Sequence, residues 1–207
     1  IVTGAVIKKL ARHYAQAIGC GDASIHLVYH QWMGAFPTDK SFAEQLINMS
    51  TVIASMVGAD KIITKTREEA AGIPTKEANA KTVADTQYTL RILNGLPNIV
   101  DEQEEEILTA EVMAIMEAVF NDPADTLWRK VFNCIKSGII DVPFSPHIIN
   151  HNKMITIRDA NKNIRIIDRG GVPIPDRCFE YERAQCDLNK DTTSTVNDII
   201  HDIGIMQ

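Results

Sequence analysis

The order of helical and strand-like segments constrains the fold of this chain more than any other feature. Residues 2–18 place apolar side chains on one face of a helix, and residues 24–33 form a nearly continuous apolar run that suits a buried parallel strand. A second amphipathic helix is expected up to residue 56, followed by a β-branched strand at 61–64. This alternation predicts a parallel α/β sheet or barrel, because helices connect its neighbouring strands.

The second of these helices has the clearest apolar stripe, which we expect to face the core. Thr38 or Asp39 can cap its first turn, and Gly58 ends it. The stripe repeats every three or four residues and consists of Phe42, Leu46, Met49, Ile53 and Met56.

Helices also dominate the middle of the chain. They are expected at 75–93, at 101–120, and from Asp122-Pro123 to Gly138. A short buried strand at 139–142 follows and is cut off by a proline. The three parallel strands expected in this sequence cannot close a barrel, which takes eight, so we expect the chain to be a fragment or one piece of a larger assembly.

The last part of the sequence changes character. Residues 154–158 and 164–168 alternate apolar and polar side chains and predict an antiparallel hairpin. Two helices are expected after it, at 175–188 and 195–203. We therefore place a domain boundary near residue 148, between βα units at 1–148 and a small α+β region at 149–207.

Composition excludes several classes of protein. A net charge of −6 gives no sign of the basic surface that nucleic-acid binding requires, and no apolar run reaches the roughly 18 residues of a membrane span. The first residues lack an initiator Met and the pattern of a signal peptide, so we interpret the start as an internal cut. The cysteines form no Cys-x-x-Cys pair and are typical of reduced core thiols in a cytoplasmic protein: Cys20, Cys134, Cys178 and Cys186.

Two pairs of histidines have the spacing of four that could bind zinc on a helix. His26 and His30 lie in an expected strand, however, and His147 and His151 follow a proline and lack the glutamate of His-Glu-x-x-His. We interpret these histidines as structural or surface residues and assign no metal ligand in the chain.

Residues that could carry chemistry are concentrated at 61–80, KIITKTREEAAGIPTKEANA. Lys65 follows the strand, Thr66 can cap a short turn, and Glu69 stands three residues later, which is the spacing of a capping box. Ligands of α/β proteins bind at strand ends and in the loops that follow, so Lys65 and Glu69 are the first candidates for a binding site. The same spacing also fits an exposed ion pair and a helix cap without any ligand.

Three segments resemble signatures of the E (ε) subunit of methylaspartate mutase, also called glutamate mutase. They are residues 61–80, HQWMGAFP at His30–Pro37 and DVPFSP at Asp141–Pro146. The resemblance runs over nearly the whole chain but corresponds only to the C-terminal portion of the family's subunit. It implies a partial TIM (β/α)8 barrel, made of the last βα units, followed by a small α+β C-terminal region.

The resemblance also implies which residues hold a cofactor. Lys65 and Glu69 would hydrogen-bond the ribose of adenosylcobalamin (coenzyme B12), while Phe36 and Ile73 would line the adenosyl and corrin face, with Met33 as a further wall residue. Phe36 and Ile73 can equally be ordinary core side chains. The sequence has no Asp-x-His-x-x-Gly motif to bind cobalt, and the resemblance assigns cobalt to a separate small cobalamin-binding (S or σ) subunit.

The activity implied is the radical carbon-skeleton rearrangement that interconverts L-glutamate and (2S,3S)-3-methylaspartate, in a cytoplasmic heterotetramer with a second E subunit. The substrate-binding arginines and the acid/base carboxylate of the family lie outside this segment. No catalytic residue can be assigned here, and we expect the isolated chain to be inactive. Two alternatives remain: an aldolase-type barrel with Lys65 as its Schiff-base nucleophile, or a non-catalytic fragment of the same family that docks a partner through its open strand edge.

Overall fold

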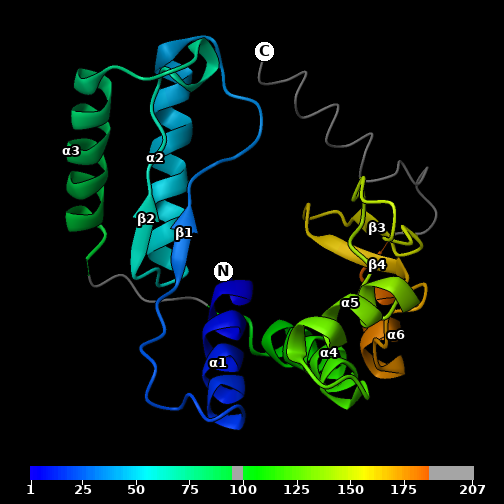
Figure 1. The fold of residues 1–207 in the computed structure, drawn as a ribbon. Coiled ribbons are helices and arrows are strands. Elements are labelled where there is room, and N and C mark those ends of the chain that lie inside the picture. The colour runs from blue at the N-terminus through cyan, green and yellow to red at the C-terminus, as the bar shows by residue number, and fades with distance from the viewer. Residues whose placement is uncertain (95–99, 187–207) are drawn as a thin grey trace. The chain divides into compact units, whose positions relative to one another are not determined.

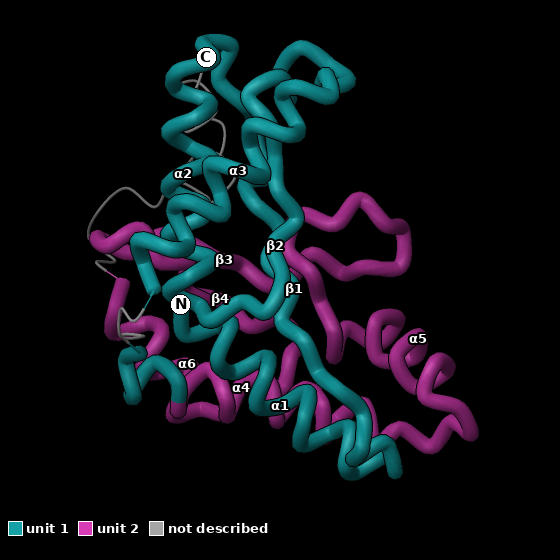
Figure 2. Tube along the Cα trace, turned by 90° about the vertical axis from the view of Figure 1, so that its left-hand side faces the viewer, with its two compact units in different colours: residues 1–105, 203–207 teal, residues 106–202 magenta. Residues whose placement is uncertain are grey.

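A computed structural model describes residues 1–94 and 100–186 of the chain (Figure 1). These residues form two compact units, which divide between Glu105 and Glu106 (Figure 2). We call them unit 1 and unit 2 and describe each by itself. The boundary expected near residue 148 separates two kinds of architecture rather than two compact units, and it stays a prediction.

Unit 1 alternates helices and strands in the order expected from the sequence. Helix α1 (Val2–Ala17) precedes strand β1 (Val28–His30), and helix α2 (Lys40–Met56) connects β1 to strand β2 (Lys61–Ile63). The two strands pair in parallel, with Val28 opposite Lys61 and His30 opposite Ile63. A short 3-10 turn η1 (Glu69–Ala71) and helix α3 (Lys76–Ile92) complete the unit. The parallel pairing is confirmed, while closure into a barrel stays a prediction.

Helices α2 and α3 begin where the sequence predicts caps. The carboxylate of Asp39 accepts hydrogen bonds from the N–H groups of Ser41 and Phe42, at 2.7 and 3.2 Å. The hydroxyl of Thr75 accepts one from the N–H of Ala78, at 3.2 Å. These side chains satisfy donors that the first turn of a helix leaves without a partner, so both caps are confirmed.

The apolar stripe of α2 does not face the core of unit 1, contrary to our expectation. Phe42 and Met49 are 62% and 61% exposed, and Ile53 is 39% exposed. The buried face of the helix consists mainly of small side chains, namely Ala43, Ile47, Ser50, Thr51 and Ala54. Small side chains let a helix approach its neighbours closely, which explains why this face, and not the stripe of larger residues, is buried.

Unit 2 contains three helices and a hairpin among its described residues. Helix α4 (Glu102–Asn121) leads into it and is followed by α5 (Leu127–Ser137), β3 (Ile155–Arg158), β4 (Ile164–Asp168) and α6 (Asp176–Ala184). The two strands pair antiparallel, with Arg158 opposite Ile164, as predicted for the hairpin. The core of the unit consists of Ile107 from α4, Cys178 from α6, and Val172 and Ile174 from the segment between β4 and α6.

A buried ion triad supports the hairpin and α6. The guanidinium of Arg165 donates to Asp159 at 2.9 Å and to Glu182 at 3.2 Å, and all three side chains are less than 8% exposed. Burial opposes ionisation of Asp159, but the hydrogen bonds from Arg165 and from Asn163 outweigh it, so the pKa of Asp159 lies below its usual value.

Two predicted elements of this region are wrong. The segment 139–142 forms a bend and irregular backbone instead of a strand, and the carboxylate of Asp141 binds the backbone N–H groups of Asn152, Lys153 and Met154. Helix α5 does not open at Asp122-Pro123; it starts at Leu127, and Thr126 caps it. Asp122 instead accepts a hydrogen bond from the N–H of Ala124, at 2.9 Å. The Asp122 side chain bonds to backbone two residues later, which favours a turn over a helix start. The Asp141 carboxylate instead holds a segment more than ten residues later.

The end of α5 follows the expected glycine signal. Gly138 has φ +82°, and a Cβ there would lie 2.8 Å from the ring of His151. Helix α6 ends at Ala184, four residues before the predicted end. The helix expected at 195–203 falls outside the described residues.

The four cysteines differ in their burial. Cys134, Cys178 and Cys186 are buried, and burial raises the pKa of each of these thiols. Cys20 is exposed, so it is not a core thiol. In the part of the chain that the structure describes, no helix has the length and apolarity needed to span a bilayer.

Candidate functional site

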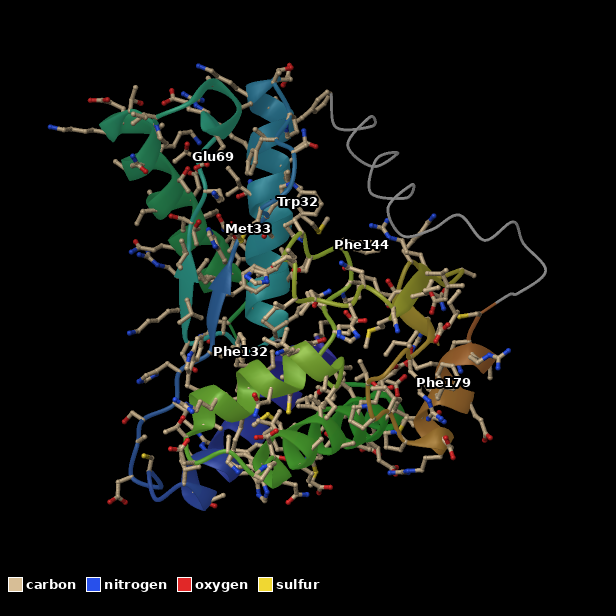
Figure 3. All side chains as sticks on the ribbon, turned by 45° about the vertical axis from the view of Figure 1, so that its right-hand side comes forward. Trp32, Met33, Glu69, Phe132, Phe144 and Phe179 are labelled. Carbon is tan, nitrogen blue, oxygen red and sulfur yellow. The ribbon has the colours of Figure 1, made fainter. Side chains whose placement is uncertain are left out.

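The candidate site lies at the carboxyl ends of β1 and β2. Both strands end here in register, at His30 and Ile63, and the chain leaves each of them for a loop that leads into a helix. Helices α2 and α3 begin on this side of the unit (Figure 1). Figure 3 shows Trp32, Met33 and Glu69 beyond the tips of the two strands. Parallel α/β sheets bind ligands at this end, which makes both loops candidates.

Lys65 and Glu69 meet in this loop after β2. The ammonium of Lys65 lies 3.2 Å from a carboxylate oxygen of Glu69, and the two side chains are 23% and 24% exposed. The other carboxylate oxygen of Glu69 accepts a hydrogen bond from the N–H of Thr66, at 3.3 Å. The spacing of the sequence therefore gives the ion pair and the bond from the N–H of Thr66 to Glu69, whereas the 3-10 turn begins after Glu68 without a side-chain cap. An ammonium has three donors and a carboxylate about four acceptor sites, so the pair can bind further hydroxyl groups without separating.

The loop of Glu69 is fixed to the surrounding helices by polar contacts. Glu68 accepts hydrogen bonds from the N–H of Thr75 at 2.8 Å and from its hydroxyl at 3.0 Å. These two bonds lower the pKa of Glu68, although the residue lies at the surface. Arg67 donates to Glu44 of α2 at 2.9 Å. The loop that carries the candidate pair is thus held from both α2 and α3.

Large apolar side chains are exposed in both loops. Ile73 is 98% exposed and Met33 is 72% exposed, so neither is a core residue, while Phe36 is partly buried. Gly72 precedes Ile73 with φ +118° and ψ −131°, a backbone conformation that favours glycine. Met33 and Ile73 are therefore available for contact with another molecule.

The loop after β1 is closed by a tryptophan that we did not single out from the sequence. The indole N–H of Trp32 donates to the carbonyl of Ala35 at 2.7 Å. A Cβ on Gly34 would lie 2.8 Å from the indole ring, so this tight turn requires glycine. The dipeptide Trp-Met before a glycine was a signal for this turn.

Gln31 is a second residue that sequence reasoning missed. It directly follows β1 and its side chain is fully buried. Its carbonyl oxygen accepts a hydrogen bond from the backbone N–H of Lys65 at 2.8 Å, and its NH₂ group donates to the hydroxyl of Thr51 in α2, also at 2.8 Å. The signal available in the sequence was a glutamine directly after a strand that we expected to be buried.

The surroundings of Lys65 do not favour the aldolase alternative. A Schiff-base lysine needs its amine free to attack a carbonyl carbon. Lys65 instead donates a hydrogen bond to the carboxylate of Glu69, at 3.2 Å. Over residues 1–94 and 100–186, no group of three His, Cys, Asp or Glu side chains is placed to hold a metal ion.

The chain matches a known protein family over most of its length. The family model described as methylaspartate mutase E chain (MutE) matches residues 3–198. The chain belongs to the methylaspartate mutase E chain family. Both loops of the site, and the Asp141–Pro146 segment, lie inside the matched range.

Individual relatives of this family agree. The chain is 35% identical over 207 residues to the glutamate mutase epsilon subunit of Escherichia coli O157:H7, covering 96% of this chain and 43% of that protein. It is 35% identical over 182 residues to the epsilon subunit of Treponema denticola, with 86% and 38% covered. For Halobacterium salinarum the identity is 30% over 171 residues, with 82% and 36% covered. The chain therefore spans less than half the length of these relatives.

Proposed function

We propose that this chain is the part of a methylaspartate mutase epsilon subunit that holds the adenosyl group of adenosylcobalamin. The reaction is the interconversion of L-glutamate and (2S,3S)-3-methylaspartate. One observation carries the proposal: the Lys65–Glu69 pair, 3.2 Å apart, stands at the carboxyl ends of two parallel strands. Exposed Ile73 and Met33 in the two loops would supply apolar surface for a large cofactor.

The residues present fit such a ligand. A ribose offers neighbouring hydroxyl groups that each donate and accept, and an ammonium beside a carboxylate offers a donor and an acceptor at matching separation. When bound, the cofactor supplies the radical chemistry of the rearrangement through its cleavable cobalt–carbon bond. The chain lacks the Asp-x-His-x-x-Gly motif, so we assign cobalt ligation to a small cobalamin-binding subunit.

The residues of this chain would bind and orient rather than catalyse. Lys65 donates to a ribose oxygen, and Glu69 accepts from a ribose hydroxyl. Contacts that tighten during the reaction stabilise its transition state more than its ground state. Ile73, Met33 and the partly buried Phe36 exclude water from the site, which keeps reactive species from being quenched.

The proposal extends to the fold and the assembly. Strands β1 and β2 make a parallel pair whose outer edges need neighbours, and we propose that they belong to a TIM (β/α)8 barrel. The substrate-binding part would come from the remainder of the epsilon subunit. The active assembly would be a cytoplasmic heterotetramer with a second epsilon subunit and two small subunits.

Reconstitution tests this function. The chain is combined with a polypeptide that supplies the rest of an epsilon subunit, a small cobalamin-binding subunit and adenosylcobalamin, and 3-methylaspartate formed from L-glutamate is measured by NMR. We expect turnover with all parts present and none when the chain is combined with the small subunit alone. Lys65→Met and Glu69→Gln should each lower turnover about 10- to 100-fold, the size expected for one lost charge-assisted contact.

A matched control uses a second lysine–glutamate pair of unit 1. Lys9 lies 2.9 Å from Glu105, and the Lys9 side chain is 58% exposed. Lys9→Met should leave turnover unchanged. Equal turnover by Lys65→Met and the unsubstituted chain would refute the proposed role of the pair.

The exposed stripe of α2 supports a second candidate function. Phe42 and Met49 are more than half exposed, which suits a fragment that docks another protein without catalysis. An assembly that forms but does not bind adenosylcobalamin would favour this alternative.

A further inference from the structure

We propose that Gln31 is a positioning residue that fixes Lys65 for its contact with the cofactor, an inference that rests on the proposed function. Gln31 extends the pairing of the two strands by one step, because its backbone N–H donates to the carbonyl of Ile63 at 3.1 Å. Its side-chain oxygen then accepts from the N–H of Lys65 at 2.8 Å. A side chain thus takes the place that the backbone of β1 would occupy if the ladder continued.

The orientation of this amide follows from its other partner. Thr51 is fully buried, and its hydroxyl donates to the carbonyl of Ile47 at 2.9 Å. A hydroxyl has one proton, so towards Gln31 it can only accept, and the group of Gln31 that lies 2.8 Å away must be the NH₂. The carbonyl oxygen of Gln31 is therefore the atom that faces Lys65.

A side-chain hydrogen bond in place of a backbone hydrogen bond of the sheet lets the two loops separate. The chain after β1 turns away at Trp32, whose N–H donates to the hydroxyl of Ser50 at 3.2 Å. Lys65 remains tied to the same strand through Gln31. Two adjacent residues of α2, Ser50 and Thr51, thus anchor both loops, one directly and one through Gln31. Such an arrangement lets the two loops diverge while the base of the Lys65 side chain stays fixed.

Catalytic assemblies lose much of their rate when a binding group shifts by about 1 Å. The side chain of Lys65 is long and flexible, so fixing its backbone helps to keep the ammonium in place. Buried hydrogen-bonded networks of this kind are costly unless each member is satisfied. In this network the NH₂ group of Gln31, the hydroxyl of Thr51 and the N–H of Lys65 each have an acceptor within 2.9 Å. The geometry therefore assigns Gln31 a role in Lys65 placement beyond filling space.

The test measures the affinity of the reconstituted assembly for two cobalamins. Adenosylcobalamin carries the ribose that Lys65 and Glu69 would bind, and methylcobalamin does not. Gln31→Met keeps the length of the side chain but removes both hydrogen bonds. We expect it to weaken adenosylcobalamin binding about tenfold, the effect of one hydrogen bond to a charged group, and to leave methylcobalamin binding unchanged.

Thr51 supplies a milder pair of variants that preserve the strand ends. Thr51→Val removes the acceptor for the NH₂ group of Gln31 and should weaken adenosylcobalamin binding a few-fold, whereas Thr51→Ser keeps the hydroxyl and should match the unsubstituted chain. Lys65→Met should abolish the preference for adenosylcobalamin, and adding Gln31→Met to it should cause no further loss, because the two residues act as one unit. Hydrogen exchange of the Lys65 amide should quicken in Gln31→Met without any cofactor present.

The outcomes separate this inference from the proposed function. If Gln31→Met weakens both cobalamins equally, or Thr51→Val and Thr51→Ser behave alike, the residue is merely structural and the inference is overturned while the function of Lys65 stands. If the unsubstituted assembly shows no preference for adenosylcobalamin over methylcobalamin, or Lys65→Met leaves that preference intact, the proposed function fails and the inference fails with it. Should Gln31→Met not fold, the Thr51 pair decides.

Discussion

The carboxylate of Asp141 should contribute strongly to the stability of unit 2, and Asp141→Asn measures that contribution. One of its oxygens accepts from the side-chain amide of Asn150 at 2.9 Å and the N–H of Asn152 at 2.7 Å. The other accepts from the N–H groups of Lys153 and Met154, at 2.6 and 2.9 Å. Asp141 is 6% exposed, so water cannot easily replace these partners.

Asparagine keeps the shape of the side chain but turns one oxygen into an NH₂ group. Whichever oxygen remains, two donors lose their acceptor and face another donor. A buried donor without an acceptor costs about 1–3 kcal/mol. Asn152 and Lys153 lie at the surface and can partly turn to water, so we take the lower part of the range and expect a loss of about 2–4 kcal/mol in the free energy of unfolding.

Urea unfolding followed by far-UV circular dichroism measures this loss, and hydrogen exchange of residues 150–156 locates it. The matched control is Asp168→Asn, because Asp168 is an exposed carboxylate that accepts from the N–H of Gly170 at 2.9 Å. The control should change stability by less than about 0.5 kcal/mol, as surface substitutions usually do. A loss below about 1 kcal/mol in Asp141→Asn would show that the Asp141 network does not hold the segment.

The pH dependence gives the same prediction a second readout. Burial opposes ionisation of Asp141, but the N–H groups of Met154, Lys153 and Asn152 outweigh it, so the pKa of Asp141 lies below the usual 3.8. A carboxyl group whose pKa is lower in the folded state stabilises the fold above about pH 4, and this stabilisation disappears as the pH falls through the folded pKa. Stability of the unsubstituted chain should therefore fall below about pH 4, and Asp141→Asn should show a shallower fall.

Three further predictions follow from described contacts. Arg165→Met leaves two buried carboxylates without their partner and should lower the free energy of unfolding by about 3–5 kcal/mol in urea titration; a loss under 1 kcal/mol would contradict the buried triad. Gly138→Ala should destabilise more than Gly19→Ala, since both have positive φ but only Gly138 lacks space for a Cβ, and thermal melts compare them; equal melting temperatures would contradict the clash. In the native chain Cys20 should react rapidly with a thiol reagent while the three buried thiols react slowly; labelling at similar rates would contradict their burial.

Local signals in the sequence predicted the helices and the site pair well. Asp39 and Thr75 cap their helices because a cap depends on residues two or three positions apart, and the Lys65–Glu69 contact follows from the four-residue spacing. The hairpin of β3 and β4 was predicted equally well, since two alternating segments flank the turn-forming residues Asp-Ala-Asn-Lys-Asn.

Apart from the start of α5, which a local bond from Ala124 to Asp122 moved, the errors came from contacts between distant segments. The stripe of α2 was assigned to the core, yet Tyr29 of β1 and Gln31 after it contact Ser50 and Thr51 on the other face. The pattern of a helix with two possible faces does not reveal which one its neighbours select. The strand expected at 139–142 failed because Asp141 finds its partners more than ten residues later, at 152–154. Gln31 was overlooked for the same reason: its partner Lys65 lies thirty-four positions away.

Gly72 gives this loop a particular kind of fragility. Its φ of +118° and ψ of −131° belong to a region that side chains of L-residues block. A single methyl group at this position would force the peptide to rotate, and Ile73 would then point in another direction although no contact of Ile73 itself had changed. The direction of Ile73, the most exposed apolar side chain in the loop, is thus set by the backbone conformation of Gly72, where a Cβ would meet no atom within 4 Å.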